Sequence, residues 1–117
     1  MIFDILSKYS SVVSDYQVIK YRFFKTSYEV VLKIYIIDNS ILFVRDYLFT
    51  DSKRKYSFHW QNPDGDCIYR WDNVPHHQET TTFPFHKHVG KTETLKDSEV
   101  MNLEKVLHFI NNHFRNS

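Results

Sequence analysis

Residues 56–73 read YSFHWQNPDGDCIYRWDN, and this stretch decides the fold that the sequence predicts. Its two outer runs, Tyr56–Gln61 and Cys67–Trp71, are rich in the aromatic and β-branched residues that strands favour. Between them lies the turn sequence Asn62-Pro63-Asp64-Gly65, in which proline presets φ at the second position and glycine tolerates a positive φ at the close. The stretch therefore predicts a β-hairpin that places its two strands side by side.

The chain before this hairpin predicts a short helix followed by three more strands. Apolar residues between Ile2 and Tyr9 recur with the spacing of one helical face. The segments Val12–Phe24, Tyr28–Ile37 and Ile41–Phe49 are again rich in aromatic and β-branched residues, so we expect strands there. Asp38-Asn39-Ser40 has the composition of a turn, which indicates that the last two of these strands are also joined closely.

The chain after the hairpin predicts a loop, a short edge strand at His86–Val89 and a second helix. Val74–Phe85 is polar and contains two prolines, which favours a loop. Apolar residues from Leu103 to Phe114 recur at helical spacing, and Asn102 is a suitable N-cap. The expected fold class is therefore α+β: an antiparallel meander sheet of about five to six strands, with a short N-terminal helix and a C-terminal helix packed on it.

The composition indicates one soluble domain over residues 1–117, with no membrane partner. Hydrophobic residues make up 42% of the chain and charged residues 25%, and no apolar run approaches the ~20 residues of a bilayer span. Met1–Ser11 lacks the pattern of a signal peptide, and the lone Cys67 cannot form an internal disulfide, so we expect a cytoplasmic protein. Only two glycines occur, which excludes glycine-rich phosphate loops.

Five of the seven histidines lie between Phe58 and Gly90, among arginine, lysine and aspartate. Cleavage of RNA without a metal ion needs a base for the 2′-hydroxyl proton and an acid for the leaving oxygen, and histidine suits both roles. A cation must stabilise the charge that develops on phosphorus. The candidates for base and acid are His59, His76, His77, His86 and His88. Arg70 and Lys87 are the candidate cations, and Asp72 is suited to orienting a histidine.

A metal site is the second hypothesis for the same residues. In a strand, the His86 and His88 rings of a His-x-His pair lie on one face, where imidazole nitrogens can bind Zn²⁺ or a similar ion. A third ligand would come from His76, His77 or Asp72. The chain has neither a His-Glu-x-x-His motif nor paired cysteines. The sequence therefore favours a solvated edge strand over a metal site, and we expect no metal or other cofactor.

Binding without catalysis is a third hypothesis, because exposed aromatic and arginine side chains can stack on the bases of RNA. An aromatic-rich sheet also needs large residues in its core, and we expect at least one of Trp60 and Trp71 to lie there. The sequence leaves the oligomeric state open, including a homodimer.

Several blocks of the second half occur in an order that resembles the TumE family, the toxin components of prokaryotic type II toxin–antitoxin pairs. These blocks are Tyr-x-Phe-His-Trp-Gln, Asp-Gly, Ile-x-Arg-Trp-Asp-Asn-x-Pro-His-His, Phe-Pro-x-His-Lys-His-Val-Gly and Leu-x-x-Val-Leu-x-Phe-Ile. The resemblance extends from about Tyr56 to Ile110. It maps the family's motif onto His59, Asp64, Gly65, Arg70, Asp72, Asn73, Pro75, His76, His77, Pro84, His86, Lys87, His88 and Gly90.

The resemblance implies an intracellular toxin that a cognate antitoxin protein neutralises. Together with the histidine-rich segment, it gives the leading hypothesis of a toxin that is a small metal-independent endoribonuclease. The alternatives are a metal-dependent phosphodiesterase that uses the same residues and a non-enzymatic toxin that inhibits its target by binding.

Overall fold

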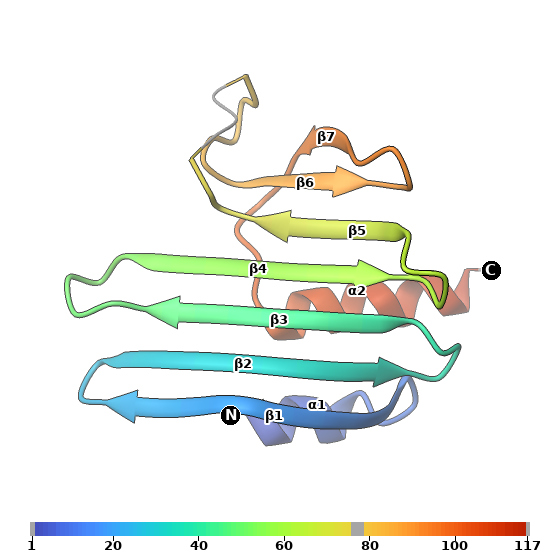
Figure 1. The fold of residues 1–117 in the computed structure, drawn as a ribbon, viewed down its shortest axis with the longest axis horizontal. Helices are drawn as coiled ribbons and strands as arrows, with labels where there is room; N and C mark the ends of the chain where they lie inside the picture. The colour runs from blue at the N-terminus through green and yellow to red at the C-terminus, as the bar shows by residue number, and fades with distance from the viewer. Residues whose placement is uncertain (1, 76–78, 117) are drawn as a thin grey trace.

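The computed structural model describes residues 2–75 and 79–116, which form a seven-stranded antiparallel sheet with two helices behind one face (Figure 1). The strands follow one another across the sheet in chain order, so the topology is a simple meander. In chain order the elements are α1 (Ile2–Lys8), β1 (Val13–Phe24), β2 (Ser27–Ile36), β3 (Ile41–Leu48), β4 (Arg54–Gln61), β5 (Cys67–Asp72), β6 (His86–Val89), β7 (Thr94–Asp97) and α2 (Leu103–Arg115).

The β4–β5 hairpin forms as its turn sequence predicts. The Gly65 amide donates to the Asn62 carbonyl (2.9 Å), and the Asn62 side-chain oxygen accepts from the Asp66 amide (2.9 Å). Gly65 has a φ of 89°, in the left-handed region that glycine adopts without a Cβ clash. Beyond a register shift between Trp60 and Gln61, the pairing places His59 opposite Arg70 and Phe58 opposite Trp71. This pairing joins the two sequence blocks that carry most of the candidate site residues.

Alternation along the strands divides the sheet into a face covered by helices and a face without them. The helix-covered face holds the core, in which Trp60 and Trp71 are both buried, as expected for at least one of them. The helix α2 begins as predicted, because the Asn102 side chain accepts from the Lys105 amide (2.8 Å). No helix in the described ranges is long and apolar enough to cross a membrane.

The fold class is confirmed, but the expected number of strands is wrong. The described residues contain seven strands, and the unpredicted one is β7, whose sequence Thr94-Leu95-Lys96-Asp97 contains a single apolar residue. This strand forms the edge of the sheet and is largely exposed, so it needs no hydrophobic pattern. Because β7 pairs with β6, the prediction of a solvated edge strand at His86–Val89 is also wrong.

Candidate active site on the helix-free face

Five of the predicted site residues lie together on the face of the sheet that carries no helix. His59 on β4 is opposite Arg70 on β5, and Arg70 is opposite His88 on β6. The same strand pair places Asp72 opposite His86. Neighbouring strands are about 4.8 Å apart, so the three strands hold these side chains within one small area. We call Arg70, Asp72, His86 and His88 the Arg70 cluster.

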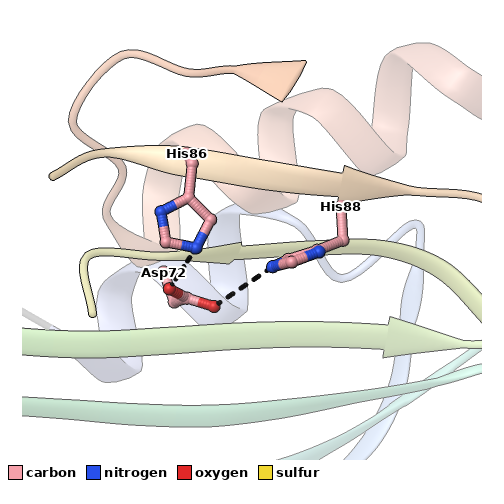
Figure 2. Close-up of side chains that lie close together, drawn as sticks. All are labelled: Asp72, His86 and His88. Carbon is pink, nitrogen blue, oxygen red and sulfur yellow. Dashed lines mark ion pairs between the residues drawn. The ribbon is translucent and has the colours of Figure 1, made fainter. Parts of the chain in front are cut away.

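Both histidines of the Arg70 cluster point from β6 toward the carboxylate of Asp72 (Figure 2). His86 Nε2 lies 2.7 Å from Asp72 Oδ1, and His88 Nε2 lies 3.9 Å from Asp72 Oδ2. The relative exposures of Asp72, His86 and His88 are 5%, 1% and 7%. The three polar side chains are thus withdrawn from water, where electrostatic attraction is stronger and desolvation is costly.

Backbone groups fix the orientation of these side chains. His86 Nδ1 lies 3.0 Å from the Pro84 carbonyl, and His88 Nδ1 lies 3.4 Å from the Glu93 carbonyl. A carbonyl oxygen only accepts hydrogen bonds, so a hydrogen bond in either contact requires a proton on Nδ1. The Val74 amide donates to Asp72 Oδ1 (3.1 Å) and holds the carboxylate in place. Each imidazole therefore directs its Nε2 atom, and not Nδ1, toward the acid.

Arg70 connects the buried acid to the exposed part of the site. Its Nε atom is 3.4 Å from Asp72 Oδ2, and its Nη1 atom is 3.4 Å from Glu93 Oε1. About one third of the Arg70 side chain (34%) is exposed, whereas only 7% of the Asp72 side chain is. The guanidinium group therefore remains accessible to an anion while a buried carboxylate restrains its position.

His59 is half-buried beside Arg70, and this environment favours the neutral imidazole. Burial, followed by the positive charge of Arg70, lowers the pKa of His59, while Glu93 and a hydrogen bond with Gln61 oppose the change. Burial and Arg70 likewise lower the pKa of His88. A neutral His59 at pH 7 has a ring nitrogen that can take a proton from a bound molecule.

Among the described site residues that the sequence predicted, Lys87 does not join this arrangement. Lys87 alternates with His86 and His88, and its Nζ atom lies 5.9 Å from the centre of the Tyr69 ring. It is opposite Trp71, a core residue of the helix-covered face. His76 and His77 lie outside the described residues.

The structure also adds residues that the sequence did not single out. Phe43 on β3 is opposite His59, with ring centres 6.4 Å apart, and Lys33 on β2 is opposite Phe43. Their place in this row follows from strand register, which a single sequence defines poorly. Glu93 reaches Arg70 from the β6–β7 turn, and this position depends on the unpredicted strand β7.

These observations define the class of protein: a small α+β domain that carries a polar cluster on the face of its sheet without helices. The family model described as Toxin TumE matches residues 2–114, so this chain belongs to the TumE family. It is therefore the toxin component of a toxin–antitoxin system, and such a toxin has an antitoxin partner. No curated protein and no solved structure matches the chain.

Proposed function

We propose that this toxin is an endoribonuclease that cleaves RNA on the helix-free face, with side chains and not a metal ion contacting the reacting atoms. The observation that supports this function best is the pairing of a half-buried His59, whose pKa is lowered, with a partly exposed Arg70 on the neighbouring strand. A neutral imidazole beside a fixed guanidinium supplies a base and an electrophilic stabiliser for phosphoryl transfer.

The reaction begins when His59 removes the proton from a ribose 2′-hydroxyl. The 2′-oxygen then attacks the adjacent phosphorus, and Arg70 stabilises the negative charge that develops on the phosphate oxygens. The bond to the 5′-oxygen breaks, this oxygen takes a proton, and the products carry a 2′,3′-cyclic phosphate and a 5′-hydroxyl. His76 and His77, outside the described residues, are the sequence candidates for the proton donor.

The buried part of the Arg70 cluster acts through Arg70 in this proposal. Asp72 is nearly inaccessible and lies 3.4 Å from Arg70 Nε, so it positions the guanidinium and does not contact RNA. His86 holds the other oxygen of Asp72 at 2.7 Å and is itself almost fully buried. Asp72 and His86 are therefore positioning residues, because they orient the Arg70 side chain and do not contact RNA themselves.

The neighbouring strands supply a surface that suits an RNA strand. Phe43 is 36% exposed and lies next to His59 in the cross-strand row. The Lys33 Nζ atom lies 5.7 Å from the centre of the Phe43 ring and 5.3 Å from that of Tyr35. Aromatic rings that stack on bases, with nearby cations for phosphates, are the usual elements of single-stranded RNA recognition.

Purified toxin incubated with RNA in the presence of a chelator tests the proposed reaction. Wild-type protein should cleave the RNA, and His59→Gln should lower the rate by about 10²–10⁴-fold, the usual contribution of a general base. His108→Gln is the matched control, because His108 is exposed on α2 and should leave cleavage unchanged. Intact RNA after incubation with folded wild-type protein would refute the ribonuclease proposal.

Growth arrest by the same variants separates cleavage from inhibition by binding. If the toxin is a nuclease, His59→Gln should abolish toxicity while RNA binding is retained. A non-enzymatic binder would show the opposite pattern: toxicity would survive in His59→Gln and be lost in Phe43→Ala, which removes an exposed aromatic ring.

A further inference from the structure

We propose that Asp72, His86 and His88 form a binding site for a divalent transition-metal ion, with Zn²⁺ as the probe. One donor atom from each residue lies within 4.8 Å of the other two. The two imidazoles approach the carboxylate from the neighbouring strand, with ring planes 83° apart (Figure 2). The site goes beyond the proposed ribonuclease and does not depend on it, because none of its three ligands contacts RNA in that reaction.

The spacing of the donor atoms is close to that of a zinc site. In a tetrahedral site with metal–ligand distances of about 2.0–2.1 Å, neighbouring donor atoms are about 3.3 Å apart. His86 Nε2 lies 2.7 Å from Asp72 Oδ1 and His88 Nε2 lies 3.9 Å from Asp72 Oδ2, so the two distances to the carboxylate lie on either side of this value. Binding of one ion would draw the three donor atoms, which lie within 4.8 Å of one another, closer together by rotation of the side chains.

The groups around the three ligands support the same conclusion. Histidines that bind metals usually donate the other ring N–H to a carbonyl or carboxylate, and ligating carboxylates accept hydrogen bonds of their own. Here His86 Nδ1 faces the Pro84 carbonyl and His88 Nδ1 faces the Glu93 carbonyl, so both Nε2 atoms face the ligand position. The Asp72 carboxylate accepts a hydrogen bond from the Val74 amide.

The donor set determines which ions the site would prefer. Two imidazole nitrogens and one carboxylate oxygen suit Zn²⁺ and similar first-row metals, whereas Mg²⁺ and Ca²⁺ prefer oxygen ligands alone. Three protein ligands leave one tetrahedral position that a water molecule can fill. The burial of His86 and His88 contradicts the sequence prediction that they lie on a solvated strand.

Calorimetric titration of chelator-treated, desalted toxin with Zn²⁺ tests the site. Wild-type protein should bind one equivalent. Substitution of residues that only hydrogen-bond to metal ligands lowers metal affinity by roughly 10–100-fold. His88→Gln removes a ligand itself, so it should weaken Zn²⁺ binding by more than that. His108→Gln and His113→Gln are matched controls on α2 and should bind as tightly as wild type. No saturable binding by the wild type would overturn the proposal.

A second variant and a spectroscopic measurement keep the test decisive if His88→Gln folds poorly. Asp72→Asn retains the shape of the side chain but weakens it as a metal ligand, so it too should lose Zn²⁺ binding. In the wild type, nitrogen NMR should show Zn²⁺ shifting the Nε2 resonances of His86 and His88 while Nδ1 stays protonated. Unchanged Nε2 resonances at saturation, or full binding by both variants, would reject these ligands. The RNA assay in chelator is separate, so either proposal can fail alone.

Discussion

Two aspartate–arginine clusters lie on opposite faces of the same sheet, and their geometries differ. In the Arg54 cluster on the helix-covered face, the guanidinium group of Arg54 contacts both oxygens of Asp46 at 2.8 Å and donates to the Met101 carbonyl at 2.7 Å. The hydroxyl of Tyr28 donates to the same aspartate at 3.1 Å. In the Arg70 cluster, the contact between arginine and Asp72 is 3.4 Å.

The same pair of residue types therefore has two roles: the Arg54 cluster stabilises the fold, and the Arg70 cluster is a candidate functional site. Arg54 has its fork of donors occupied and lies over the Tyr56 ring at 4.5 Å, so it has little capacity left for a ligand. Arg70 is more exposed and makes longer contacts with two carboxylates. The comparison predicts that Arg54 determines stability and Arg70 determines activity.

The largest expected effect is on RNA cleavage by Arg70→Gln. Removing the guanidinium group that stabilises the developing charge should lower the cleavage rate by about 10²–10³-fold. The free energy of unfolding should fall by less than it does for Arg54→Gln, because His86 and the Val74 amide still contact the Asp72 carboxylate after the substitution. Single-turnover cleavage and urea denaturation measure the two quantities. An equal loss of stability and activity would remove the distinction between the clusters.

The sequence identified the Arg70 cluster better than the Arg54 cluster, for physical reasons. The turn at Asn62–Gly65 brings β4 beside β5, and a register shift between Trp60 and Gln61 then places His59 opposite Arg70, so the pairing depends on one short segment. The contacts of Arg54 reach Asp46 on β3 and the carbonyl of Met101, 47 residues away along the chain. Such contacts depend on how α2 returns to the sheet, which local patterns do not encode.

The errors within the candidate site have a similar origin. Strand alternation alone could have separated Lys87 from His86 and His88, because the side chains of a strand alternate between faces. The burial of the two histidines could not be read from the sequence, because it depends on β7, a polar strand without a hydrophobic pattern. The row from Lys33 through Phe43 to His59 likewise requires the register of three strands.

The next largest effect is expected for Arg54→Gln, this time on stability. The substitution leaves Asp46 partly buried without its cation and removes a donor from the Met101 carbonyl. Breaking a buried pair costs about 3–5 kcal/mol, and the residual exposure of both side chains reduces our expectation to about 2–3 kcal/mol. Urea denaturation gives the value. Cleavage of RNA by the remaining folded protein should be unchanged, whereas a selective loss of cleavage would contradict the assignment.

The smallest effect is on the titration of His59. The pKa of His59 is lowered in the folded protein, so the unfolded chain binds more protons just below pH 6.5, and this group contributes less stability as the pH falls through that window. Arg70→Gln removes the positive charge that faces His59 while burial, Gln61 and Glu93 remain, so the pKa should rise. Arg54→Gln should leave it unchanged. NMR titration of the imidazole measures the midpoint, and the same midpoint in wild type and Arg70→Gln would show that Arg70 does not control the proposed base.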